Sequence, residues 1–549
     1  MTNSPKTNIY RLAIVVISAI LFIPFLGSVH LFDWDEINFA ESAREMILSK
    51  DYLTVQVNFQ AFWEKPPLFE WFQVLSMKVF GINEFAARFP NAITGIITLL
   101  ILFNIGKKIY NEKFGLIWVL VYAGSILPHF YFKTGIIDPM FNLFIFLGIY
   151  YFILFTTSEK LILKYVFFSA VFIGLGILTK GPVAFLLFFL TAFIYMVINK
   201  TYKKFLNIKV VSIFALTVSF VGGFWFILQL LNGNYNILVK FIEYQIRLFT
   251  IEDAGHGGFF LYHFVVLFVG VFPASIFMLK SFRKNKEADF GLNMFKQWMI
   301  ILFWVVLILF TIVNTKIVHY SSMCYFPMGF LASYIIYQIF EEKQRFDKCM
   351  KILIVVMSVI IGSLVLLLQF IVQYKEKIIA MHIIKDDFAV ANLGADVYWS
   401  GFEFLVGAIL IVGVLSSLFA FKSVKKQIVG IFVSSLLFVN LTMIFIVPRI
   451  EQYSQNAALV FYKKISKENC YLDTFGFKSY AIYYYFDKQK PENELSYNQN
   501  WLLEGKIDKP VYMVCKITSE NQFSTNYPKF KKVLSKNGFV FFKREVIGN

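Results

Sequence analysis

Charged residues are scarce in this sequence, and their scarcity limits the possible folds. Only 16% of the 549 residues are charged, whereas 58% are hydrophobic and 19% are aromatic. Soluble globular domains carry about 25% charged residues, so the composition excludes a soluble domain and indicates a membrane protein. Internal repeats and low-complexity segments are also lacking. The first apolar stretch has no small-residue cleavage site after it, and we therefore interpret it as an anchor, not as a removed signal peptide.

Apolar stretches of about 20 residues recur from the N-terminus to Val447, and each is long enough to cross the hydrocarbon core as a helix. We predict about thirteen such spans, in an all-α polytopic membrane protein. They begin near residues 11, 88, 114, 135, 161, 181, 208, 259, 296, 319, 351, 401 and 427.

Lysine and arginine residues gather in every second connection between these spans. The basic connections contain Lys107, Lys108 and Lys113; Lys160 and Lys164; Lys200, Lys203, Lys204 and Lys209; Arg283, Lys284 and Lys286; Lys343, Arg345 and Lys348; and Lys422, Lys425 and Lys426. Because positive loops stay on the cytoplasmic side, this alternation predicts a cytoplasmic N-terminus and an extracytoplasmic C-terminus. Topology and contact with membrane lipids then explain the net charge of +17, and no nucleic-acid partner is expected.

Three predicted extracytoplasmic pieces are long: residues 33–87, residues 231–258 and the chain after Val447. We expect interfacial helices within 33–87, as part of a transmembrane domain over residues 1–447. Residues 448–549 are more polar, with strand-like segments at 470–474 and 511–515, which predicts a small extracytoplasmic α/β domain. Its Cys470 and Cys515 share an oxidising compartment, so a disulfide and two buried thiols on neighbouring strands are both open.

Three carboxylates, Asp33, Asp35 and Glu36, follow directly after the first span. We interpret Asp33 as a helix cap, because acids near a helix N-terminus are favoured by the dipole and by free N–H groups. Asp35 and Glu36 form a pair that can supply a general base for a hydroxyl group.

Two further groups of residues suggest a site in these loops. Glu64 and Lys65 precede two prolines, which fix the backbone and end any preceding helix; an interfacial turn with solvated charges is the plainer interpretation. His256 lies in a glycine-flanked loop. Its imidazole could bind a divalent metal ion with a carboxylate from another loop, although a loop histidine is more often simply solvated.

Lys180 and Lys316 lie at the outer ends of spans, on the side where lysine is disfavoured. Their side chains either snorkel toward lipid headgroups or hold a lipid phosphate by charge-assisted hydrogen bonds.

Several of these motifs together resemble one family. They are Asp35-Glu36, Phe39-Ala40-Glu41, Ala43-Arg44-Glu45-Met46, Glu64-Lys65-Pro66-Pro67-Leu68 and Gly81-Ile82-Asn83-Glu84, followed by weaker matches at Asp138, Thr179-Lys180-Gly181-Pro182, Arg247 to His256 and Lys316 to Pro327. The sequence resembles the aminoarabinose transferase branch of the GT-C glycosyltransferases, relatives of the protein O-mannosyltransferases. Asn38 departs from the arginine that is usual after the acidic pair.

The resemblance implies transfer of a sugar from a polyprenyl (undecaprenyl) phosphate carrier at a bacterial inner membrane. The implied roles are a catalytic base at Asp35, metal ligands at Glu64 and His256, carrier-phosphate contacts at Lys65 and Arg247, and closure of the site by Lys316 and Tyr320. The ion would be divalent, with Zn, Mg and Mn not distinguished.

The acceptor remains open among lipid A, another glycan or glycolipid, and protein hydroxyls, because acceptor choice depends on loops. A transporter or a flippase for lipid-linked sugars is the main alternative. Transporters place ionisable residues near the membrane midplane, whereas these charges concentrate in loops on one face. A degenerate scaffold is disfavoured by the intact site residues. The sequence does not determine the sugar or the oligomeric state.

Overall fold

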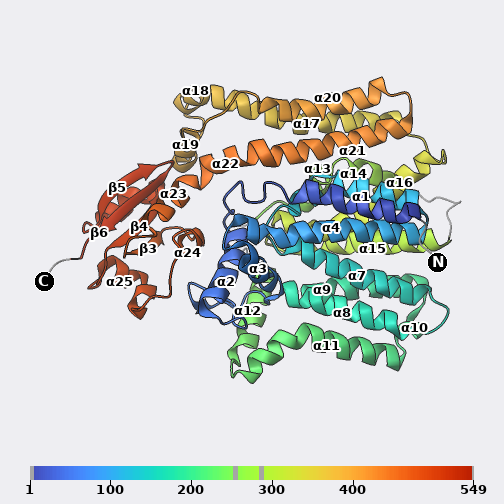
Figure 1. Ribbon diagram of the computed structural model, residues 1–549, viewed down its shortest axis with the longest axis horizontal. Helices are drawn as coiled ribbons and strands as arrows, with labels where there is room; N and C mark the ends of the chain where they lie inside the picture. The colour runs from blue at the N-terminus through green and yellow to red at the C-terminus, as the bar shows by residue number, and fades with distance from the viewer. Residues whose placement is uncertain (1–4, 251–256, 283–289, 547–549) are drawn as a thin grey trace.

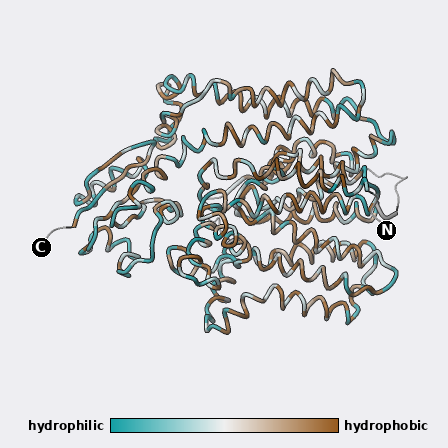
Figure 2. Tube along the Cα trace, viewed as in Figure 1, coloured by the Kyte–Doolittle hydropathy of each residue, from teal (hydrophilic) through white to brown (hydrophobic). Residues whose placement is uncertain are grey.

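The computed structural model describes residues 5–250, 257–282 and 290–546. Figure 1 shows a helical bundle with a small α/β domain at one end, and the N-terminus lies at the opposite end. Hydrophobic residues follow the length of the bundle helices, whereas hydrophilic residues gather at the ends of the bundle and in the α/β domain (Figure 2). This distribution is that of a membrane-spanning bundle with a polar domain outside the membrane.

The bundle contains the predicted spans. Its helices are α1 (Pro5–Phe22), α4 (Glu84–Ile109), α5 (Glu112–Ala123), α6 (Ile126–Tyr131), α7 (Asp138–Thr157), α8 (Leu163–Lys180), α9 (Val183–Asn199), α10 (Tyr202–Phe205), α11 (Ile208–Leu231), α13 (Tyr262–Gly270), α14 (Ala274–Met278), η1 (Leu279–Phe282), α15 (Phe290–Ile312), η2 (Val318–Cys324), α16 (Tyr325–Phe340), α17 (Lys348–Gln373), α20 (Phe404–Ala420) and α21 (Val424–Leu441). Within the described ranges, nine helices are long and apolar enough to cross a membrane, fewer than the thirteen spans predicted. The other predicted spans correspond to the shorter helices α9 and α20, of 17 residues each, and to the two broken spans described below. The predicted multi-pass helical architecture is confirmed.

Two predicted spans are broken, not straight. The span predicted from residue 259 consists of α13 and the α14–η1 segment, which meet at an angle of 110°. Pro273 precedes α14 at this bend, where its missing N–H and fixed φ prevent the helix from continuing. The span predicted from residue 114 is divided into α5 and α6 at Gly124 and Ser125.

The first loop forms a layer between the bundle and the α/β domain (Figure 1). It contains α2 (Asp35–Ser49), a hairpin of β1 (Gln56–Val57) and β2 (Gln60–Ala61), and α3 (Leu68–Phe80). The expected helices are therefore present. Every residue of α2 from Glu36 to Met46 is buried, so this helix lies inside the protein and not on an exposed interface.

The C-terminal region is built on a mixed four-stranded sheet. Its elements are η3 (Thr442–Ile446), α22 (Val447–Ser454), α23 (Asn456–Ile465), β3 (Tyr471–Phe475), α24 (Ala481–Tyr484), η4 (Glu494–Tyr497), α25 (Gln499–Glu504), β4 (Val511–Lys516), η5 (Ile517–Ser519), α26 (Glu520–Asn526), β5 (Lys531–Lys536) and β6 (Phe539–Arg544). The strand order is β3-β4-β6-β5, and β3 and β4 are parallel. The two strands predicted from sequence are β3 and β4. The domain boundary predicted at Val447 falls within a continuous helical run from α21 through α22.

The two cysteines of this domain are free thiols. Cys515 lies on β4, and Cys470 directly precedes β3. The parallel register pairs Tyr471 with Val511 and Phe475 with Cys515. Cys470 therefore lies at the opposite end of the strand pair from Cys515, separated by several steps of about 3.3 Å along the strands. The two thiols are therefore not joined. Of the predicted pair of buried strand thiols, only Cys515 is buried on a strand, whereas Cys470 is partly buried.

The C-terminal domain shares a hydrophobic core with α2. Ile37, Ala40 and Ala43 of α2 lie in one buried cluster with Tyr480 and Tyr484 of the domain. The domain thus packs directly on the helix that begins at Asp35.

A buried ion pair strengthens this contact. The Arg44 guanidinium donates to Glu41 at 2.7 Å, to Asp487 at 2.9 Å and to the carbonyl of Lys488 at 2.7 Å. Arg44 joins both parts of the protein because its fork of donors reaches carboxylates from α2 and from the C-terminal domain.

A pair of short helices after α17 was not anticipated. They are α18 (Lys375–Ala380) and α19 (Asp387–Leu393), of six and seven residues. The ring of Phe388 packs edge-on against Phe539 of β6, with centroids 5.2 Å apart. Helices this short have too few turns for their hydrophobic periodicity to be recognised.

Candidate active site

A cavity of about 630 Å³ lies between the first loop and the C-terminal domain. It is also lined by the start of α7, the end of α8, helix α12 (Asn236–Thr250) and residues 310–320. Seven of the predicted site residues line it: Asp35, Glu36, Glu64, Lys65, Lys180, Arg247 and Tyr320. The volume is in the range of about 300–1,000 Å³ typical of ligand sites.

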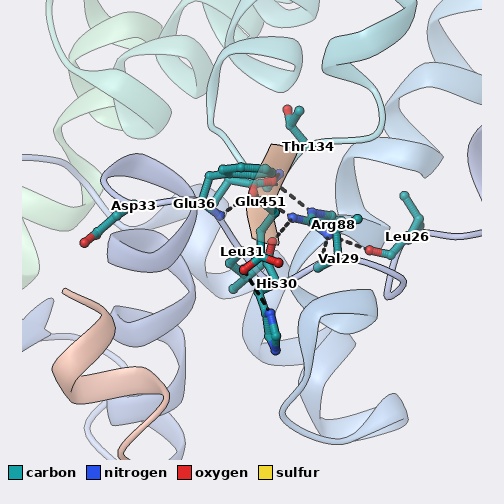
Figure 3. A network of polar contacts seen from close by, with 12 residues as sticks. Leu26, Val29, His30, Leu31, Asp33, Glu36, Arg88, Thr134 and Glu451 are labelled. Atoms are coloured by element: carbon teal, nitrogen blue, oxygen red, sulfur yellow. Dashed lines mark hydrogen bonds and ion pairs between the residues drawn. The ribbon is translucent and has the colours of Figure 1, made fainter. Parts of the chain in front are cut away.

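Glu36 lies beside the cavity in a buried ion pair with Arg88 of α4 (Figure 3). Its two carboxylate oxygens accept hydrogen bonds from the Arg88 side chain at 2.9 and 2.8 Å, and from the backbone N–H groups of Phe32 and Gly135 at 2.9 and 2.5 Å. Burial favours the neutral acid, but the Arg88 charge and these bonds outweigh it and lower the pKa of Glu36. A carboxylate engaged in this way holds the start of α2 in place and is poorly suited to the expected role of base.

Asp35 starts α2 and faces a histidine that we had not assigned to the site. Its Oδ2 lies 3.3 Å from His319 Nε2, and the same nitrogen lies 3.9 Å from Asp138 Oδ2. Lys180 completes the group, with its Nζ 2.6 Å from Asp138 Oδ1. Asp138 occupies the first turn of α7, where free N–H groups and the helix dipole favour a carboxylate. Asp35 is 40% exposed, so a ligand in the cavity can reach it.

Lys65 and Arg247 form a cationic side of the cavity around one tyrosine. Lys65 Nζ donates to the Tyr244 hydroxyl at 2.9 Å and lies 4.4 Å from its ring centre. The Arg247 guanidinium lies 5.2 Å from the same ring, and its Nη2 lies 4.0 Å from Glu64 Oε1. With Lys180 and with Lys478 of the C-terminal domain, these groups give the cavity four cations, which suits a phosphate ligand.

Two predicted site residues do not contribute to the described cavity. Lys316 is buried, and its Nζ donates to the carbonyls of Phe310, Thr311 and Val313 at 3.1, 2.6 and 2.6 Å. It therefore caps the C-terminal end of α15, and the expected contact with the carrier phosphate is not supported. His256 lies outside the described residues.

The C-terminal domain supplies a wall of the cavity through Lys478 and Tyr480. The Tyr480 ring packs edge-on against Trp34, with centroids 5.4 Å apart, and Lys478 Nζ lies 5.3 Å from the Trp34 ring centre. Asp33 fixes this segment by accepting hydrogen bonds from the Ser479 hydroxyl and the Tyr480 N–H. The interpretation of Asp33 as a helix cap was wrong, because the start of α2 has no side-chain cap.

Asp33 has an unusual protonation equilibrium. Burial raises its pKa to about 6, against the opposing effect of its hydrogen bonds and of Lys478. In Figure 3 it points away from the Glu36–Arg88 network. We therefore expect the contact between the first loop and the C-terminal domain to depend on pH.

Glu64 and His256 are the two expected metal ligands. Glu64 lines the cavity and is 29% exposed, which is compatible with a ligand, but its expected partner His256 is not described. Within the described ranges, no three His, Cys, Asp or Glu side chains are grouped so as to hold a metal ion.

Comparisons with known proteins agree with this geometry. The family model for dolichyl-phosphate-mannose-protein mannosyltransferases matches residues 64–225. Two crystal structures of ArnT from Cupriavidus metallidurans superimpose with TM-scores of 0.72, bound to undecaprenyl phosphate, and 0.74, in the apo state; each covers at least 97% of both chains at 14–15% identity. The chain has the ArnT fold. The resemblance to the GT-C aminoarabinose transferases predicted from the motifs is confirmed.

Curated relatives show the same likeness in sequence. An undecaprenyl phosphate-alpha-4-amino-4-deoxy-L-arabinose arabinosyl transferase from Wigglesworthia glossinidia brevipalpis is 27% identical over 347 residues, which is 60% of this chain and 59% of the relative. An uncharacterized protein from Aquifex aeolicus is 27% identical over 59% of this chain and 63% of its own. The matches span about three fifths of these relatives.

Sequence reasoning missed His319, Lys478 and Tyr480 as site residues. His319 is one of only six histidines and immediately precedes Tyr320, and this scarcity was a usable signal. Lys478 and Tyr480 carried no signal, because they reach the cavity only through the packing of a separate domain.

Proposed function

We propose that this protein is a glycosyltransferase that moves a sugar from a polyprenyl phosphate carrier, such as undecaprenyl phosphate, to an acceptor. Lipid A, another glycolipid and a protein hydroxyl are the acceptor classes considered. The supporting observation is the cavity itself, which places an accessible carboxylate, Asp35, in one pocket with the cations Lys65, Arg247 and Lys180, within an ArnT fold.

The residues of the cavity can serve both halves of such a transfer. The acceptor hydroxyl attacks the anomeric carbon of the sugar, the bond from that carbon to the phosphate oxygen breaks, and the carrier leaves with its phosphate. Asp35 takes the proton of the hydroxyl as general base. Lys65, Arg247 and Lys180 stabilise the negative charge that develops on the leaving phosphate.

A divalent metal ion remains part of the proposal. Glu64 and His256 would hold it, and it would supply additional positive charge for the leaving phosphate. No step above depends on it, since Asp35 and the three cations account for the proton and the phosphate.

The proposed orientation places the cavity on the extracytoplasmic side of the inner membrane. The basic segment around α10 lies at the end of the bundle that also holds the N-terminus, away from the C-terminal domain (Figure 1). Positive charge at that end supports a cytoplasmic N-terminus. Single cysteines introduced in α10 and in α25 would test this orientation. Only the cysteine on the extracytoplasmic side should react with a membrane-impermeant reagent.

The decisive experiment is transfer by the purified protein. Wild-type protein in nanodiscs is incubated with an undecaprenyl phosphate-linked aminopentose or hexose and with lipid A, a glycolipid or a serine-containing peptide, and products are identified by mass spectrometry. We expect a glycosylated acceptor with the wild type and with D387N, a matched control because Asp387 is exposed in α19, and none with D35N.

A flippase predicts a different result. It would move the lipid-linked sugar between the leaflets of sealed vesicles without forming a glycosylated product. The wild type and D35N would then give the same result in the transfer assay. Leaflet exchange without transfer to any acceptor in the panel would overturn the proposed function.

A further inference from the structure

Asp35 needs a partner that holds its carboxylate in place, and His319 is the side chain that pairs with it in the described part of the chain. Asp35 lies at the first position of α2 and is 40% exposed, so it is not confined by packing. A base displaced by about 1 Å from its productive position loses about 100-fold in rate.

The imidazole of His319 is itself well fixed. Its side chain is only 13% exposed, and its ring packs edge-on against Tyr320, with centroids 5.4 Å apart. Its Nε2 lies between two carboxylates, at 3.3 Å from Asp35 and 3.9 Å from Asp138.

Asp138 explains why this ring does not turn away. One of its oxygens, Oδ1, is bound by Lys180 at 2.6 Å, whereas the other, Oδ2, is buried without a hydrogen bond among the described residues and faces His319. A buried carboxylate oxygen without a partner is costly, so it favours an N–H group at this position.

We propose that His319 is a positioning residue for Asp35: its Nε2–H donates to Asp35 Oδ2 and leaves Oδ1 free to take the proton of the acceptor hydroxyl. The negative charge of Asp138, which is held by Lys180 and lies 3.9 Å from the same nitrogen, favours the ring orientation in which Nε2–H faces the two carboxylates. This inference rests on the proposed function, and it assigns a role to three residues beyond the base itself.

The proton and the charges balance in this arrangement. The acceptor hydroxyl loses its proton to Asp35, the new glycosidic bond forms as the bond to the carrier phosphate breaks, and the carrier leaves with one more negative charge on its phosphate. His319 keeps its own proton throughout. The charged groups that surround it are two carboxylates, Asp35 and Asp138, and two lysines, Lys180 and Lys65. The negative and positive charges around the imidazole are therefore equal in number.

The test uses two substitutions that separate hydrogen bonding from packing. In H319Q, the amide nitrogen replaces the Nε2–H donor, whereas in H319L the volume remains but the donor is lost. We expect H319L to lower kcat about 100-fold while the KM for the lipid-linked donor stays within about twofold. H319Q should retain activity within about tenfold of wild type.

Two controls complete the experiment. H382Q changes an exposed histidine of the segment between α18 and α19 and should leave kcat unchanged. D35N sets the level of complete loss of the base, and H319L should retain measurable transfer above it, because His319 positions Asp35 and does not replace it. H319L with near wild-type kcat, or H319Q as inactive as H319L, would overturn the inference while D35N still supports the proposed function. Absence of transfer by the wild type would overturn both.

Discussion

The Glu36–Arg88 pair provides the sharpest test of how the site is held. Arg88 is buried and donates to both oxygens of Glu36, and it also donates to the carbonyls of Leu26, Val29 and His30 at 2.7, 2.8 and 3.0 Å. Glu36 in turn accepts two backbone N–H groups. The pair therefore joins α2, α4, the end of the first span and the loop before α7 (Figure 3).

The expected magnitudes follow from these contacts. E36Q removes the charge that balances Arg88, and the new side-chain amide N–H group faces the hydrogen-bond donors that Glu36 had accepted from. The substitution should lower the free energy of unfolding by about 3–5 kcal/mol. R88M leaves the Glu36 charge buried and also frees three carbonyls, each contributing about 1 kcal/mol, so its effect should be larger. Because both substitutions break the same pair, the double variant should be less destabilised than the sum by about 2–3 kcal/mol.

The assay is thermal unfolding of the purified variants in nanodiscs, together with transfer rates at a temperature where each is folded. We expect the unfolding temperature to be highest for the wild type, lower for E36Q, and lowest for R88M and the double variant, which should lie close together. Additive effects would show that the two residues are not coupled. A stable E36Q that has lost more than 100-fold in kcat would refute our interpretation and restore Glu36 as a catalytic residue.

Three further predictions concern the cavity and the domain contact. K65A and R247A should each raise the KM for the lipid-linked donor by about 10- to 100-fold, because each removes a charge-assisted contact to phosphate. K316A should leave this KM unchanged. A drop in the thermal stability of K316A without a change in KM would agree with the role of Lys316 at the end of α15. Asp33 has a pKa raised to about 6 in the folded protein, from 3.8 when exposed, so its contribution to stability is full below pH 3.8 and is lost as the pH rises through 6. The unfolding midpoint of the wild type should therefore fall relative to that of D33N between pH 4 and pH 7, and parallel curves would contradict this. Metal content, measured by mass spectrometry on purified protein, should fall in E64Q and in H256Q but not in D387N, and equal metal content in all three would remove the metal from the proposal.

The sequence by itself determined the membrane bundle, the order of its spans and two neighbouring strands of the C-terminal domain, β3 and β4. These features depend on local pattern: a run of apolar residues long enough to cross a bilayer forms a helix wherever it packs, because its backbone must bond to itself. The motifs around Asp35, Glu64 and Lys65 also identified the cavity, since these residues of the first loop line it.

Only the tertiary structure decided which charges are available for chemistry. Asp35 and Glu36 are adjacent in sequence, yet one faces the cavity beside His319 and the other is engaged by Arg88, 52 residues away along the chain. Lys316 has the same sequence signature as Lys180 but turns toward carbonyls of α15. The distinction depends on where distant segments pack, because burial and the nearest opposite charge, and not residue type, determine whether a charged group serves structure or a ligand.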